Sequence, residues 1–141
     1  MNQHDYEKRL GWSIGEELQS PHFTGKVFSN PLIDGYDCQA ALITFEPNCI
    51  NDYHAHHGAE QTLICIGGQG FYQEEGKEII VMTPGTAIVV PNGVKHWHGA
   101  TEHAWFSHIV IYSKAIPKDT EWLETVPQDI YKVAQKSIPD A

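Results

Sequence analysis

Apolar residues alternate or run in short blocks over most of the chain, and turns rich in Gly and Pro separate the blocks. Over residues 39–46, Ala41, Ile43 and Phe45 fall on one face, and both faces are largely apolar. A strand of this kind is buried on both sides, as it would be inside a sandwich or barrel. The same pattern predicts further strands over residues 62–66, 70–74, 78–82, 86–90, 94–98 and 105–112. Short strands at regular spacing predict an all-β sandwich or barrel.

The two ends of the chain differ from this β pattern. Residues 23–28 predict a short edge strand, and residues 127–136 have helical spacing, with Pro127 near the first turn, where proline is tolerated. A chain of 141 residues is the usual length of one domain. We therefore predict a single domain over residues 1–141, with a short N-terminal extension, a β-barrel core over about 23–113 and a C-terminal helical tail over about 115–141.

Composition and charge narrow the classes of partner. The hydrophobic content of 41% and charged content of 19% are ordinary for a water-soluble domain. A formal net charge of −9 argues against nucleic acid and against anionic membrane surfaces. The polar N-terminus lacks the apolar centre of a signal peptide, and no apolar run reaches the roughly 18 residues needed to cross a membrane. Cys38, Cys49 and Cys65 form no CxxC pair, so we expect reduced thiols and a cytoplasmic protein.

Histidines gather in the middle of the chain in a spacing that indicates metal binding. His54 and His56 are one residue apart, so on a strand their imidazoles lie on the same face. His96, on a distant predicted strand, can bring a third imidazole to the same point. Neutral imidazole is the commonest metal ligand in proteins. The spacing therefore predicts a metal site that an acceptor side chain from the next strand completes.

Two motifs in the chain resemble the paired signature of the cupin superfamily. They read Asn48-x5-His54-x-His56-x4-Gln61-x6-Gly68 and Gly85-x5-Pro91-x-Gly93-x2-His96. The consensus is G-x5-H-x-H-x3,4-E-x6-G followed by G-x5-P-x-G-x2-H-x3-N. This chain departs from it at Asn48, which replaces the leading Gly, and at Ala100, which replaces the closing Asn. Asn tolerates positive φ better than most residues, so we expect the turn at Asn48 to be kept.

A closer resemblance is to the small single-barrel cupins that include carboxymuconolactone-decarboxylase-associated proteins and manganese-dependent cupin hydroxynitrile lyases. It rests on the runs over residues 72–77 and 93–101. The resemblance implies a jelly-roll (double-stranded β-helix) barrel, a homo-oligomer, and one divalent transition metal per chain held by three His and one Gln. Manganese is the metal that the resemblance implies, although mixed N/O ligation also suits Fe, Ni and Zn.

Carried onto this chain, the resemblance makes His54, His56 and His96 the imidazole ligands. For the fourth ligand, the spacing alone leaves both Glu60 and Gln61 open, and the resemblance favours Gln61. A neutral amide at that position would leave the site more positively charged than a carboxylate would.

The same comparison assigns residues around the metal. His98 shares a strand face with His96, so it can face the same cavity, and the resemblance makes it the general base. The resemblance places His108 as a further histidine lining this cavity. Strand alternation and the resemblance together give a small apolar substrate pocket lined by Ala41, Ile43, Phe106, Val110 and Tyr112. Tyr112 departs from the lyases, which have a smaller amide side chain there.

We therefore expect a metal-dependent enzyme acting on a small apolar hydroxyl or carbonyl compound. The leading hypothesis is cleavage of a cyanohydrin, as in a hydroxynitrile lyase, with His98 as base. The alternatives are a metal-dependent dioxygenase and a non-catalytic cupin that binds a small molecule. The expected partners are a small-molecule substrate and further copies of the chain in a dimer or higher homo-oligomer, with no nucleic acid and no membrane.

Overall fold

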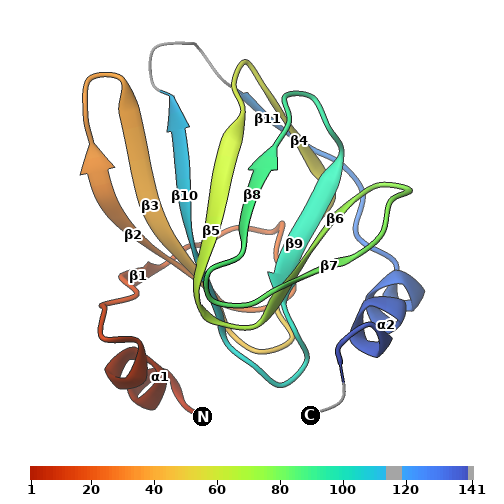
Figure 1. Ribbon diagram of the computed structural model, residues 1–141, viewed down its shortest axis with the longest axis horizontal. Coiled ribbons are helices and arrows are strands. Elements are labelled where there is room, and N and C mark those ends of the chain that lie inside the picture. The colour runs from red at the N-terminus through yellow and green to blue at the C-terminus, as the bar shows by residue number, and fades with distance from the viewer. Residues whose placement is uncertain (114–118, 140–141) are drawn as a thin grey trace.

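The computed structural model describes residues 1–113 and 119–139 and consists mainly of β-strands (Figure 1). Its elements are α1 (Gln3–Leu10), β1 (Glu16–Glu17), β2 (Val27–Asp34), β3 (Cys38–Phe45), β4 (His54–His57), β5 (Gln61–Gly68), β6 (Gly70–Glu74), β7 (Ile80–Met82), β8 (Ala87–Val90), β9 (His96–Ala100), β10 (Phe106–Ser113), β11 (Asp119–Trp122) and α2 (Gln128–Lys136). One antiparallel sheet has the order β1-β2-β3-β10-β5-β8, and the other has the order β11-β4-β9-β6-β7. The prediction of an all-β barrel with a C-terminal helix is confirmed.

The interior between the two sheets is filled by side chains from both of them. Phe45 and Leu63 from the first sheet pack in one cluster with Tyr72 and Met82 from the second. These four side chains are almost completely buried. Fully burying an apolar side chain of this size contributes about 1.5–3 kcal/mol to the stability. Burial of these apolar side chains between the two sheets therefore stabilises the barrel.

The predicted edge strand at residues 23–28 is misplaced, because β2 begins at Val27 and continues to Asp34. Pro31 lies within β2, next to a register shift between Pro31 and Ile33. Pro31 lies beyond the two residues of β2 that pair with β1, so this part of β2 is a free edge. A proline on a free edge removes no ladder hydrogen bond, which explains why the strand tolerates it.

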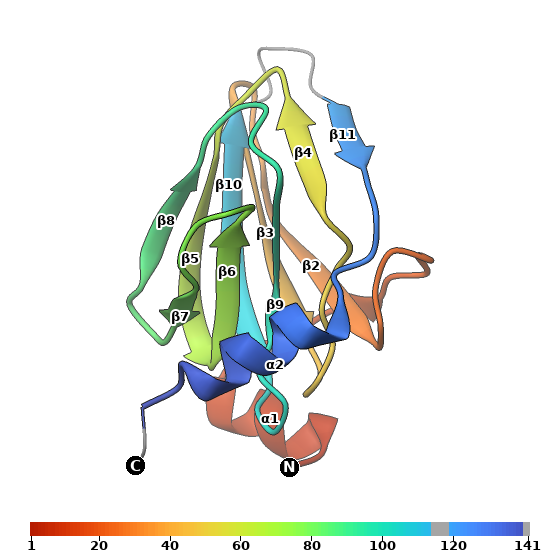
Figure 2. The same ribbon diagram turned by 90° about the vertical axis from the view of Figure 1, so that its right-hand side faces the viewer.

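β11 is a strand that the sequence pattern did not predict. It pairs antiparallel with β4, from Asp119 opposite His57 to Trp122 opposite His54 (Figure 2). Its four residues, DTEW, lack apolar alternation, so the tail was expected to be helical throughout. The helix α2 begins only at Gln128, directly after Pro127. Residues 114–118 and 140–141 of the expected tail lie outside the described residues.

Two helices cover outer surfaces at the end of the barrel where both termini lie (Figure 1). The Tyr6 hydroxyl of α1 hydrogen bonds to Ser107 Oγ of β10 at 2.7 Å. The Tyr131 hydroxyl of α2 donates to the carbonyl of Ala100 at 2.9 Å. Each helix is thus fixed to the outside of one sheet, and the barrel interior is left for other groups. Within the described ranges, no helix is both long and apolar enough to cross a membrane.

Two turn residues support the alignment with the two motifs. Asn48 has φ 70° and is the only non-glycine residue in the described part of the chain with positive φ, so the turn is kept as expected. Gly68 has φ 71°, and a Cβ there would collide with the carbonyl oxygen of Trp105. Gly67 has no positive φ. The positive φ of Gly68 agrees with the alignment in which the x6 spacing, counted back from the motif glycine, reaches Gln61.

Candidate metal centre

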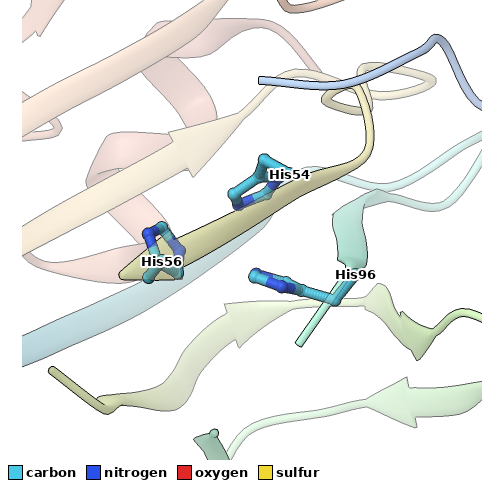
Figure 3. Close-up of side chains that lie close together, drawn as sticks. All are labelled: His54, His56 and His96. Atoms are coloured by element: carbon cyan, nitrogen blue, oxygen red, sulfur yellow. The ribbon is translucent and has the colours of Figure 1, made fainter. Parts of the chain in front are cut away.

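β4 and β9 bring three buried imidazoles together. His54 and His56 lie on one face of β4, and His96 of β9 pairs directly opposite His54. One ring nitrogen from each of the three histidines lies within 4.8 Å of the others. Figure 3 shows the ring of His96 reaching from β9 toward the two rings on β4. The three-histidine cluster predicted from the spacing is confirmed as a group that could hold a metal ion.

Hydrogen bonds on the far side of the rings fix the nitrogen atoms that face the cluster. The Nδ1 atoms of His54 and His96 lie 2.9 Å from the Asp52 carbonyl oxygen and 2.8 Å from the Val94 carbonyl oxygen. A carbonyl only accepts, so both rings carry their proton on Nδ1 and their lone pair on Nε2. The Nε2 atoms of His56 and His96 are buried without a hydrogen-bond partner. Metal-binding histidines have this arrangement, so the residues fit a metal ion.

The third ring, His56, has two neighbours at its Nδ1. Thr120 Oγ1 lies 3.3 Å away and Gln61 Nε2 lies 3.4 Å away. A ring that ligates through Nε2 carries its proton on Nδ1, and it can donate a hydrogen bond to a hydroxyl but not to an amide NH₂. Thr120 is therefore the hydrogen-bond acceptor of a ligating His56, and the Gln61 amide lies at the same edge of the ring.

The two candidates for the fourth ligand lie in different surroundings. Gln61 begins β5 and lines the cavity beside the cluster together with His56. Glu60 precedes the strand and is exposed. Gln61 as the fourth ligand stays a prediction, and its position beside the cluster agrees with it.

Burial holds the three histidines of the cluster in their neutral form. Burial, together with repulsion from the nearby His96, lowers the pKa of His54 to about 3 and that of His56 to about 4. Burial also lowers the pKa of His96. A histidine must be neutral to bind a metal ion, so the cluster is ready for an ion at pH 7.

Two more buried histidines lie next to the cluster. His98 of β9 and His108 of β10 meet edge to face, with their ring centroids 5.2 Å apart. Burial lowers the pKa of His108 to about 4, and burial together with repulsion from His108 holds the pKa of His98 well below its ordinary value. Nδ1 of His98 and both ring nitrogens of His108 have no hydrogen-bond partner. These neutral rings therefore have unused capacity to bind a ligand or to move a proton.

Asn51 fixes the position of His98. The backbone N–H of His98 donates to Asn51 Oδ1 at 2.9 Å, which leaves Asn51 Nδ2 3.3 Å from His98 Nε2. Because an NH₂ group only donates, the neutral ring accepts at Nε2 and carries its proton on Nδ1. Asn51 is buried just before β4. The sequence does not indicate this role, since strand alternation assigns no face to a residue outside the strands.

A mostly apolar cavity of about 150 Å³ opens beside the histidines, and Ile43 and Val110 line it as predicted. Tyr112 lines an adjoining hollow of about 290 Å³. The structure brings neither Ala41 nor Phe106 to the lining of these two hollows. Phe106 is completely buried beneath His108, at 5.5 Å between ring centroids. Lining residues that the sequence did not indicate are Leu18, Phe23, Phe45, Leu63, Thr120 and Trp122.

Acidification is expected to destabilise the metal-free protein. His54, His56 and His108 have native pKa values of about 3 to 4, below the ordinary 6.5, so the unfolded state binds more protons. Their contribution to stability is complete above pH 6.5 and is lost as the pH falls toward the native values. At pH 5 each such histidine lowers the free energy of unfolding by about 2 kcal/mol. Urea unfolding in EDTA at pH 7.5 and pH 5 measures this, and equal midpoints would contradict it.

Comparison with known proteins agrees with this geometry. Residues 41–112 match the Cupin domain family. The chain is 33% identical over 128 residues to "(R)-mandelonitrile lyase" of Granulicella tundricola, covering 89% of this chain and 97% of that protein. A crystal structure of a cupin-like protein from Thermotoga maritima superposes with a TM-score of 0.80 at 32% identity, covering 90% of this chain and 98% of that one. The polyketide cyclase RemF from Streptomyces resistomycificus shares the fold at a TM-score of 0.68 and 17% identity, with 86% and 87% covered.

Proposed function

The chain belongs to the Cupin domain family, and on that basis we propose that it is a metal-dependent lyase that cleaves a small cyanohydrin into an aldehyde and hydrogen cyanide. The observation that carries the proposal is the placement of two kinds of histidine at one cavity. Ligand-type imidazoles lie there beside His98 and His108, which have ring nitrogens without a hydrogen-bond partner. The similarity to a protein named for mandelonitrile cleavage supports this reaction over others known for the fold.

In this proposal, His54, His56 and His96 hold one divalent ion with Gln61 as the fourth ligand. When bound, the ion supplies a Lewis acid that stabilises negative charge on a hydroxyl or carbonyl oxygen. On an ion that takes six ligands, such as Mn²⁺, three nitrogen ligands and one oxygen ligand would leave positions open for a substrate. We propose manganese as the metal, with Fe, Ni and Zn as the other ions that this ligand set accepts.

The proton of the cyanohydrin hydroxyl goes to His98. The ring centroid of His98 lies 5.4 Å from that of His54, so His98 is in contact with the cluster. His108 lies farther from the cluster. Among the described rings, it contacts only those of His98, Phe45 and Phe106. His98 takes up the proton at Nε2, the nitrogen that carries none in the neutral ring, and the Asn51 amide gives up its hydrogen bond to that nitrogen as it does so. Its Nδ1–H can then donate a hydrogen bond to an unpartnered nitrogen of His108, while the proton itself stays on His98.

The remaining steps balance the reaction. As the hydroxyl loses its proton, the C–O bond becomes a carbonyl and the bond to the nitrile carbon breaks. The electron pair of that bond leaves with cyanide. The proton held by His98 then passes to cyanide, so the products are the aldehyde and HCN, and the ring returns to its neutral form.

The cavity limits the size of the substrate. Its volume of about 150 Å³ is similar to that of an engineered cavity of about 150 Å³ that binds benzene. Phe23, Phe45 and Trp122 supply aromatic walls. A single aromatic ring, such as that of mandelonitrile, therefore matches the cavity in size and polarity.

We expect the protein loaded with one equivalent of Mn²⁺ to release benzaldehyde and cyanide from mandelonitrile, and to consume the R enantiomer first. Benzaldehyde absorbance and a cyanide assay measure this, with EDTA-treated protein as the control. Oxygen uptake with phenolic substrates in place of cyanide release would support a dioxygenase. Binding of substrate with neither reaction would support a non-catalytic cupin.

A further inference from the structure

The strand β11, which the sequence did not predict, lies directly against two of the three histidines of the cluster. In the antiparallel pairing with β4, Thr120 is opposite His56 and Trp122 is opposite His54. Residues directly opposite each other in such a pair carry their side chains on the same face. Both β11 side chains therefore point to the cavity, and both line it. Glu121, between them, points outward and lies 2.9 Å from the exposed His57.

We propose that β11 is a brace for the metal centre, in which Thr120 orients His56 and Trp122 orients His54, so that this C-terminal strand sets the affinity for the ion. The proposal rests on the metal site but not on the reaction proposed above. Threonine and tryptophan are not usual metal ligands. Thr120 and Trp122 therefore act through the histidines, as positioning residues.

Thr120 supplies the hydrogen-bond partner that His56 does not find on its own strand. His54 and His96 use the carbonyls of Asp52 and Val94, each two residues before them in sequence. His56 instead has Thr120 Oγ1 at 3.3 Å from Nδ1. A hydroxyl at this point accepts a hydrogen bond from Nδ1–H and keeps the Nε2 lone pair directed at the cluster.

The indole of Trp122 packs against the ring of His54 and limits its rotation. Its indole lies 4.8 Å from the His54 ring and stacks on His22 at 4.3 Å with an interplanar angle of 4°. His22 Nδ1 lies 3.1 Å from the Asp52 carboxylate, and the Asp52 carbonyl accepts from His54 Nδ1. The His54 ring is thus fixed by a carbonyl at one edge and by a supported indole beside it.

β11 is an edge strand in its sheet and is secured at its C-terminal end. The backbone N–H of Leu123 donates to the Tyr53 carbonyl at 2.8 Å, and the N–H of Tyr53 donates to the Glu124 carbonyl at 3.0 Å. Lys95 Nζ donates to the Glu124 carboxylate at 2.7 Å. These contacts place Thr120 and Trp122 in a defined register against β4, as a brace requires.

The test measures metal affinity in the full-length chain without any substrate. Thr120→Val keeps the shape of the side chain and removes the acceptor. We expect it to weaken Mn²⁺ binding 10- to 100-fold in competition with a chelator, which is the usual effect of losing such a partner. Thr120→Ser keeps the hydroxyl and should bind as wild type does. Glu121→Gln, on the outward face of the same strand, should also leave the affinity unchanged.

A second variant gives a readout that a loss of folding would not mimic. Trp122→Leu should change the absorption spectrum of the Co²⁺-loaded protein, because the His54 ring is free to rotate, while far-UV circular dichroism stays that of the wild type. Equal Mn²⁺ affinity in Thr120→Val and wild type, or equal losses in Thr120→Val and Thr120→Ser, would overturn the role of the hydroxyl. Tight metal binding without cyanohydrin cleavage would overturn the proposed reaction and leave the brace standing.

Discussion

Replacing His96 with alanine will empty the metal centre and lower turnover about 10³-fold or more. His96 is the only one of the three cluster imidazoles that comes from β9, and its Nε2 is buried without a hydrogen-bond partner. Its loss leaves the proposed ligand set with the two imidazoles of β4 and the amide oxygen of Gln61, without a nitrogen ligand from the strand opposite β4. A bound metal typically supplies several kcal/mol of charge stabilisation in the transition state, so its loss is expected to lower the rate by this amount. Elemental analysis of the purified variant and the cyanide assay measure the two effects.

The chain offers a matched control for this change. His57 is next to a cluster residue in sequence and lies at the end of the same strand, but it is exposed and lies 2.9 Å from Glu121 on the outer face. His57→Ala should therefore keep its metal and its turnover. Thermal unfolding of both variants in EDTA shows whether the barrel is intact. An His96→Ala protein that still holds one equivalent of metal would show that the ion lies elsewhere.

The sequence predicted the part of the site in which ligand chemistry coincides with strand alternation. His54 and His56 share a face because they are two residues apart, and the second motif places His96 opposite them. Asn48 keeps the turn that Gly provides in the consensus, because Asn tolerates positive φ. These features depend on local spacing and local backbone conformation, which a single sequence shows directly.

The groups that the sequence did not predict are those held in place only by tertiary contacts. Thr120 and Trp122 reach the cavity because β11 pairs with β4, and the polar segment DTEW has no pattern that predicts a strand. Asn51 acts on His98 from a position outside any strand. Phe106 lies on the strand face that lines the cavity, but its side chain is buried beneath His108. Strand alternation predicts which face a side chain is on, but not how far it lies from the cavity.

The largest effect on the chemical step is expected from the pair next to the cluster. His98→Gln should lower kcat about 10²- to 10⁴-fold, which is the usual contribution of a general base. Glutamine is close in size to histidine and can still hydrogen bond to Asn51, but it does not take up a proton. The metal content should stay at one equivalent, because the histidines of the cluster keep their own partners at Asp52 and Val94. Steady-state kinetics of the Mn²⁺-loaded variant measures the change.

His108→Gln should lower kcat in the same direction if His108 accepts a hydrogen bond from Nδ1–H of His98 and so stabilises the protonated ring. Both residues then act through one protonated form of His98, so the double variant should be no slower than the slower of the two single variants. This non-additivity separates a working pair from two independent contacts, whose losses in activation free energy would add. Burial of both rings makes unfolding the main competing explanation, and unchanged thermal unfolding of each variant excludes it. Wild-type turnover in His98→Gln would remove His98 as the base, and additive losses would remove the pairing with His108.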